Sequence, residues 1–279
     1  MLNLLGGEAY KLRKGKSLFV GILVAVAIVL LLYGSLYMID KINQGELANG
    51  TGGIAVYESG GSVQEDGKSD SMMEQIGIEG VLQQMFGGHF VGLILAVLVN
   101  MFVIREYHAG AIKNLVGKGY SRRIVFFSKL LSSIVLSVIF QIVVSAVSIL
   151  IGIPFLGSKG LSLTIWKDVA TYAGLQLMFG ITITGFFVMI GEFTRNLAAG
   201  IAVSIGILLF STTLTEVLDL MCHKIDFKPS DYWILNLIPK CPLTEFETEF
   251  LVRGVLVSVV WFFLAVMLGA VHFTKADIK

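Results

Sequence analysis

The sequence predicts an all-α integral membrane protein with six transmembrane helices, both chain ends in the cytoplasm and an amphipathic N-terminal helix at the membrane interface. Of its 279 residues, 55% are hydrophobic and 15% charged, and the mean hydropathy is +0.81. Soluble domains average roughly 25% charged residues. Six apolar segments are long enough to cross a bilayer, which takes ~20 helical residues. Basic residues gather in alternate connections between these segments, as the positive-inside rule describes.

The predicted spans follow the apolar runs. The first run contains no charged residue, exceeds the apolar core of a signal peptide and lacks a small-residue cleavage site after it, which indicates an uncleaved span. The third would be ~45 Å long as a helix, so its first turns should project into the cytoplasm. The spans are 17–39, 86–104, 124–153, 169–191, 197–218 and 254–273.

The connections differ in character. Residues 1–16 place apolar side chains at helical spacing before a basic cluster, which fits an interfacial helix; a frayed basic tail is the alternative. Residues 40–85 are rich in glycine and acidic residues and should form an outer loop. In the outer region 219–253, Tyr232 and Trp233 are expected to anchor at the interface, with short helices dipping into the membrane.

The charge count supports this topology. The predicted inner segments hold thirteen of the 21 basic residues and four of the 20 acidic residues. Six of these basic residues lie between Arg105 and Lys129, against a single acid, Glu106. Residues 105–123 are therefore predicted to form a cytoplasmic loop between the second and third spans.

Several functional classes find little support. The predicted span centres contain no Asp, Glu, Lys, Arg or His, so a proton or sodium path or an intramembrane hydrolase has no site. The four histidines are too scattered for a metal site. The sequence gives no support to nucleic-acid binding, which would need a clustered basic face on a folded domain. Gly61–Ser69 resembles a phosphate-binding P-loop, but five residues separate its glycines where the motif has four.

Uncharged polar residues and small residues occur inside the spans. The polar ones are expected mainly to join helices by hydrogen bonds, with substrate contact as the alternative. Small residues between Ala198 and Gly206 allow close helix approach, either within one chain or at a dimer seam. Cys222 and Cys241 fall in the same outer region, where the sequence leaves open whether they form a disulfide. The polar residues are Asn100, Gln141, Ser145, Ser148, Gln176, Thr182 and Thr184.

Three features resemble the permease subunit of type-2 ABC exporters, the class with bacterial peptide, lantibiotic-immunity and bacitracin-resistance transporters. The stretch Glu8–Lys14 resembles the family's amphipathic N-terminal helix. The loop after the second span resembles its coupling segment, which commonly reads E-x-x-x-G-T-I-K-x-L, then a turn, S-R and a later Lys. Here Ala111 stands in place of Thr, and Gly119-Tyr120 replaces a Pro-containing turn. The six-span plan with an enlarged first outer loop is also similar.

The resemblance implies a mechanical role in a bacterial cell membrane rather than catalysis. Two cytoplasmic ATP-binding subunits, holding ATP and Mg, would dock on residues 105–123 of two permease chains, identical or paralogous, and drive an amphipathic peptide, antibiotic or lipid-like cargo. The alternative for the basic loop is that its charges only fix topology and contact lipid headgroups. A second hypothesis is a non-transporting membrane scaffold or sensor that binds a ligand through residues 40–85. The residues that the resemblance places in or near the ATPase contact are Glu106, Gly110, Lys113, Asn114 and Arg122.

Overall fold

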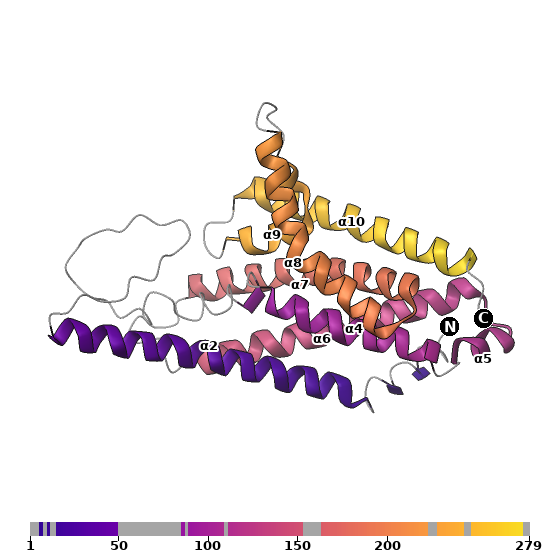
Figure 1. The fold of residues 1–279 in the computed structure, drawn as a ribbon, viewed down its shortest axis with the longest axis horizontal. Coiled ribbons are helices and arrows are strands. Elements are labelled where there is room, and N and C mark those ends of the chain that lie inside the picture. Colours follow the sequence, from indigo (N-terminus) through magenta and orange to yellow (C-terminus); the bar gives the residue numbers. More distant parts are fainter. Residues whose placement is uncertain are drawn as a thin grey trace.

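A computed structural model describes residues 6–7, 10–11, 15–49, 85–86, 89–108, 111–152, 163–222, 228–242 and 247–275. Within these ranges the chain is helical and contains no strand. These ranges contain six long helices and three short ones (Figure 1). The long helices are α2 (Lys16–Asn49), α4 (Phe90–His108), α6 (Arg122–Gly152), α7 (Leu163–Thr194), α8 (Leu197–Met221) and α10 (Thr248–Lys275); the short ones are α5 (Ala111–Gly117), η3 (Pro229–Tyr232) and α9 (Ile234–Lys240).

All six long helices are long and apolar enough to cross a membrane, which confirms the predicted number of spans. Lys16 at the start of α2 and Lys275 at the end of α10 lie at the same end of the bundle as α5 (Figure 1). We call this end the α5 end. An even number of crossings requires this arrangement, because each span returns the chain to the opposite side.

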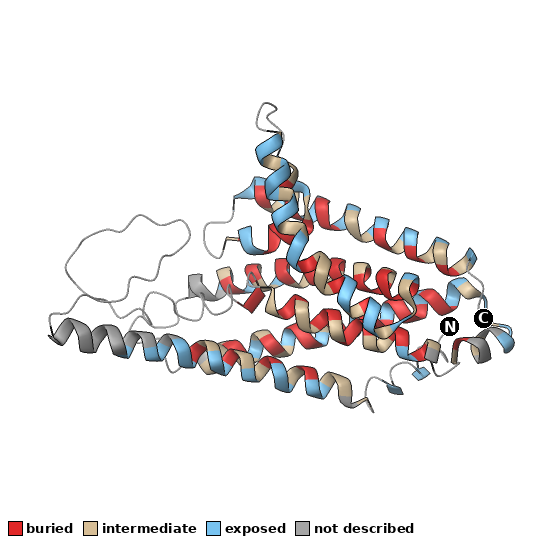
Figure 2. Cartoon of the chain, in the orientation of Figure 1, coloured by how far each residue is buried: buried red, intermediate tan, exposed pale blue. Residues whose placement is uncertain are grey.

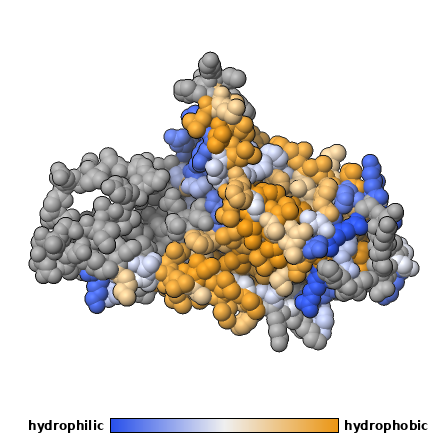
Figure 3. Space-filling model, viewed as in Figure 1, coloured by the Kyte–Doolittle hydropathy of each residue, from blue (hydrophilic) through white to orange (hydrophobic). Residues whose placement is uncertain are grey.

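The centre of the bundle is α7, which packs against α4, α6, α8 and α10. Buried residues make up 61% of the span of α7 and 56% of that of α4, but only 22% for α2 and 17% for α8 (Figure 2). The last turns of α8 project away from the other helices (Figure 1). Large apolar side chains cover the sides of α2, α8 and α10, and the space-filling view shows an apolar surface over the middle of the bundle (Figure 3). Lipid, not water, suits such a surface.

Three of the polar side chains predicted to join helices do so. The Asn100 side-chain amide donates to Ser204 Oγ on α8 over 2.8 Å. Gln176 on α7 donates to the Ile238 carbonyl of α9, 3.1 Å away. Thr182 on α7 donates to the carbonyl of Ser258 on α10 at 3.2 Å. Others stay within one helix: Gln141 donates to Ser137 and Thr184 to Gly180. Hydrogen bonds between spans are favourable because lipid offers no alternative partner.

The small residues of α8 serve packing within the chain at two positions. Gly200 and Ser204 are buried against α4. A Cβ added at Gly200 would stand 2.6 Å from Ile104 Cδ1 and 2.7 Å from Asn100 Oδ1. Ala198, Ala199 and Ala202 are exposed on the opposite side of the helix. The close approach left open by the sequence therefore includes an intramolecular α4–α8 contact.

The outer region folds back as η3 and α9. Residues 234–238 of α9 are all buried within the chain, so this region contains a short helix, as expected. Trp233 donates to Ser211 Oγ at 3.0 Å, and its ring meets that of Trp261 edge-on at 4.9 Å between centroids. Both cysteines are free thiols: Cys241 is buried and Cys222 partly exposed, so the disulfide left open by the sequence is absent from this structure.

The ends of the helices differ from those of the apolar runs that predicted them. Helix α2 continues through Asn49, so the first ten residues of the expected outer loop 40–85 are helical; most of the loop lies outside the described residues. Helix α4 begins only at Phe90, because His89 has a φ of 63° that interrupts a helix. Its other end reaches His108 rather than residue 104. Backbone hydrogen bonding continues past the last apolar residue, which hydropathy does not record.

Candidate coupling site at the α5 end

Helices α4, α5 and α6 lie next to one another at one end of the bundle. Ile112 of α5 is buried and Leu115 packs against the core, so this short helix rests on its neighbours α4 and α6. Gly119, with φ of 85°, reverses the chain between α5 and α6, a conformation that other residues adopt with strain. Ser121 then caps α6, since its Oγ accepts from the Ile124 N–H at 3.4 Å. The predicted coupling segment is thus a packed helix with a defined turn, not a loose loop.

The surface of this connection is basic. Arg105, Lys118 and Arg123 are exposed, and hydrophilic surface gathers at this end of the molecule (Figure 3). Arg122 is partly buried and turns inward: its guanidinium donates to the Thr274 carbonyl near the end of α10 at 3.2 Å. It thereby ties the start of α6 to the end of α10.

The other predicted contact residues divide into two groups. Glu106 is buried, so its carboxylate points into the bundle and is not displayed on the outer surface of the segment. Lys113 and Asn114 belong to α5, but their side chains, and Gly110 altogether, lie outside the described residues. Within residues 105–123, the exposed cations among the described side chains are therefore Arg105, Lys118 and Arg123.

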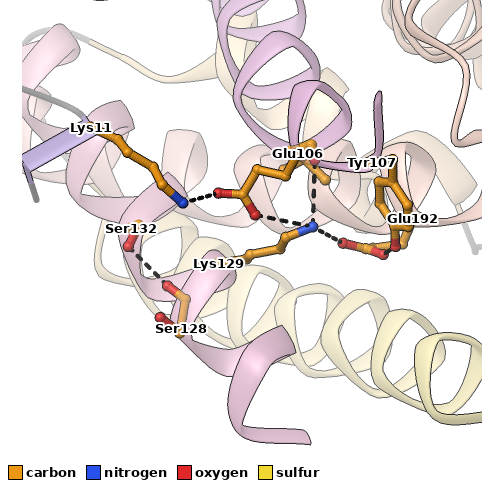
Figure 4. Close-up of polar contacts among 8 residues, drawn as sticks. Lys11, Glu106, Tyr107, Ser128, Lys129, Ser132 and Glu192 are labelled. Carbon is orange, nitrogen blue, oxygen red and sulfur yellow. Dashed lines mark hydrogen bonds and ion pairs between the residues drawn. The ribbon is translucent and has the colours of Figure 1, made fainter. Parts of the chain in front are cut away.

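Behind the segment lies a cluster of four charged residues, which we call the charge cluster: Lys11, Glu106, Lys129 and Glu192 (Figure 4). Lys129 Nζ lies 3.5 Å from a carboxylate oxygen of Glu106 on α4 and 3.5 Å from one of Glu192 on α7. The exposed fractions of the three side chains are 1%, 8% and 0%. Lys11, half-exposed, approaches the other oxygen of Glu106 at 2.7 Å.

Lys129 makes its hydrogen bonds inside the bundle. Its ammonium group donates to the Val103 carbonyl at 3.4 Å and to Glu192 Oε1 at 3.5 Å, and it also forms an ion pair with Glu106 Oε2. The ammonium also lies 4.4 Å from the ring centre of Tyr107, whose hydroxyl donates to the second oxygen of Glu192. A cation over an aromatic face contributes further attraction.

The position of the two acids explains why a lysine is required there. Glu106 and Glu192 both lie in the last turn of their helices, where the helix dipole is negative and a carboxylate is unfavourable. Lys129 lies two turns into α6, about 10 Å along its axis, and meets both acids. The ends of α4, α6 and α7 are thus held together by opposite charges from three helices.

The sequence does not reveal this cluster, because its members belong to different connections between spans. The predicted topology has Glu106 and Lys129 in one inner loop and Glu192 in another, while the structure places all three inside the bundle. One signal was present: Lys129 stands alone within the apolar run 124–153, and a lone lysine there requires a partner of opposite charge. The partner's identity depends on packing between helices, which spacing does not reveal.

A second contact joins the same end of α7 to α10. The ring of Phe193 stacks on that of His272, with 4.0 Å between centroids. With the Arg122 contact, α10 is attached to both α6 and α7 at the α5 end. The described side chains at this end therefore bind helices to one another, an arrangement suited to transmitting movement.

Comparison with known proteins identifies the family of this chain. The profile of the family described as ABC-2 family transporter protein matches residues 2–229, which includes the charge cluster and the whole of α4 to α8. No match was found among curated proteins. Members of this family are membrane transport components that are not themselves catalytic, and they generally work with an ATP-binding subunit that carries the ATPase. The chain therefore belongs to the ABC-2 transporter family and is a multi-pass membrane protein that forms the transmembrane component of an ABC transporter.

Proposed function

We propose that this chain is the permease of an ATP-driven exporter and that its ATP-binding subunit docks on residues 105–123 from the cytoplasm. The single observation that carries this proposal is the packed α4–α5–α6 connection, with its basic outer surface and its charged residues joined inside. ATP and Mg would be held by the partner subunit. The positive charge of the α5 end supports the cytoplasmic placement.

The coupling would work by rigid-body movement. Force applied to α5 reaches α4 and α6 directly, because Ile112 and Leu115 pack against the core and the turn at Gly119 is short. Lys129 passes it to α7 through Glu192, and Arg122 passes it to α10 through the Thr274 carbonyl. Packed helices switch between discrete arrangements, so a small displacement at one end can reorient whole spans.

The transporter would contain two permease chains and two ATP-binding subunits. The second permease would be either an identical chain or a paralogue. The exposed small residues of α8, namely Ala198, Ala199 and Ala202, favour close approach of another helix and support a contact there.

An amphipathic cargo suits the surface at the opposite end of the bundle. There α10 and Tyr232 line an open groove of about 750 Å³. Glu249 and Arg253 lie at one end of it, and Leu256, Val260 and Leu264 continue along the same helix. A molecule with a polar head and an apolar body, such as a lipopeptide or a lipid-like antibiotic, matches this order of side chains.

Co-purification with the ATP-binding subunit tests the proposal. Replacing both Lys118 and Arg123 by Glu should abolish co-purification, because two exposed cations on the docking surface become anions. Lys41→Glu reverses one charge at an exposed residue of α2 away from the α5 end and should leave co-purification intact. Recovery of the ATP-binding subunit in equal amounts with the double variant would refute the docking site.

The scaffold or sensor hypothesis remains the alternative. It depends on residues 40–85, of which 50–84 lie outside the described residues. Deleting residues 50–80 separates the two functions. A transporter would retain ATPase activity stimulated by the permease, whereas a sensor would lose its response to ligand. Loss of the ligand response with no ATPase partner recovered from native membranes would favour the alternative.

A further inference from the structure

A cavity of about 330 Å³ lies at the α5 end, between the N-terminal segment, the start of α2, the end of α4 and the start of α5. Its walls bring together residues distant in sequence: Lys11 and Ser17 from the N-terminal side, and Met101, Phe102 and Arg105 from α4. The cavity is large enough for a small polar group with part of an attached chain. It lies on the outer side of Glu106, opposite the side that meets Lys129.

The charge around the cavity favours an anion. Arg105 is exposed, and no hydrogen bond or ion pair joins it to another residue of the described ranges. Lys11 is half-exposed and meets one oxygen of Glu106. Glu106, the acid in the cavity wall, is also paired with Lys129 from behind. The two cations in the wall therefore exceed the acid, whose charge is already shared with Lys129.

The remaining wall is apolar. Met101 and Phe102 are partly exposed and lie one turn before Arg105 on α4, inside the segment that spans the membrane. The cavity thus has cations at its end nearer α5 and apolar side chains toward the membrane. That order matches a phospholipid at the membrane interface, with its phosphate outermost and its acyl chains inward.

We propose that this cavity binds the phosphate of an anionic phospholipid, held between Lys11 and Arg105, with an acyl chain against Met101 and Phe102. The bound lipid would attach the N-terminal segment to the end of α4. Because Lys11 also pairs with Glu106, lipid binding is linked to the charge cluster. The site is defined by residues of this chain alone and does not depend on the ATP-binding subunit.

Lipid titration of the purified full-length chain tests the site. Detergent-solubilised protein is titrated with phosphatidylglycerol, phosphatidylcholine or inorganic phosphate, and binding is followed by thermal denaturation and by native mass spectrometry. Phosphatidylglycerol should raise the denaturation temperature and remain bound; the zwitterionic lipid and inorganic phosphate should not. Arg105→Gln should weaken phosphatidylglycerol binding about fivefold, as expected for loss of about 1 kcal/mol per basic residue at a lipid surface.

Lys118→Gln is the matched control, since Lys118 is exposed at the same end but does not line the cavity. It should leave the titration unchanged, and the Arg105→Gln protein without lipid should denature like the wild type because Arg105 is exposed. Equal affinity in Arg105→Gln and wild type would overturn the proposal. An equal effect of inorganic phosphate would show a free-anion site and refute the lipid assignment. Neither result bears on whether an ATPase docks on α5.

Discussion

Replacing Lys129 by Met tests whether the charge cluster holds the helices together. Lys129 lies 3.5 Å from each of two carboxylates, and at an effective dielectric constant of 20 each attraction amounts to about 5 kcal/mol before the cost of desolvation. Removing one partner of a buried ion pair typically costs about 3–5 kcal/mol. Met fills a similar volume, so the loss reports the charge and not a cavity. We expect Lys129→Met to lower the free energy of unfolding by about 3–5 kcal/mol.

A double variant separates the charge from other effects of the substitution. After Lys129→Met, Glu106 still has Lys11 at 2.7 Å, whereas Glu192, fully buried, keeps only the Tyr107 hydroxyl among the partners described here. Adding Glu192→Gln removes that uncompensated charge and should recover at least half of the lost stability. The comparison also remains informative if the single variant is too unstable to purify, because the double variant should then be recovered.

Unfolding by dodecyl sulfate in mixed micelles, followed by tryptophan fluorescence, provides the measurement. Lys118→Met is the matched control: it removes a lysine at the same end, but one that is exposed, and should change stability by less than about 0.5 kcal/mol. The reasoning would be refuted if Lys129→Met were as stable as the control, or if the double variant were less stable than the single one.

Three further predictions concern packing, backbone and thiol chemistry. Gly200→Val should destabilise the protein by about 1–3 kcal/mol in the same assay, because its side chain would overlap α4. Gly206→Val, where a Cβ meets open space, should not. Gly119→Ala should cost about 1 kcal/mol and lower permease-stimulated ATPase activity, since φ of 85° is strained for alanine; equal activity would contradict this. Burial raises the pKa of Cys241 from 9.0 to about 12. The contribution of this buried neutral thiol to the free energy of unfolding should be complete below pH 9 and should decline from pH 9 to 12, because the thiol ionises first in the unfolded chain. At pH 8, mass spectrometry should show maleimide on Cys222 but not on Cys241.

The number of spans could be predicted from the sequence because each apolar run is longer than a bilayer core requires. Their ends could not. The run before Arg105 stops where charge begins, yet α4 continues to His108 because the backbone hydrogen bonds continue and Glu106 finds a cation inside the bundle. Hydropathy treats such a carboxylate as a loop residue. Only the three-dimensional arrangement shows that it is paired.

The connection proposed as the coupling site could be predicted from the sequence as a basic segment between two spans, but the direction of its side chains could not. In the structure this segment contains α5 and the turn at Gly119. Glu106 was expected near a partner protein, whereas its side chain faces Lys129 and Lys11. Side-chain direction at the end of a helix depends on which neighbouring helix offers a partner. For Glu106 one such partner is Lys129 on α6, which also pairs with Glu192 on α7.

Cysteine cross-linking between α5 and the ATP-binding subunit tests the central claim most directly. In a background with Cys222→Ser and Cys241→Ala, Lys118→Cys is treated in membrane vesicles with a short bifunctional maleimide. We predict that it cross-links to the ATP-binding subunit and that the yield changes when nucleotide is added, while Lys41→Cys, exposed on α2, gives no such product. The account is contradicted if Lys118→Cys gives no cross-link, or if a membrane-impermeant maleimide labels it from outside intact cells.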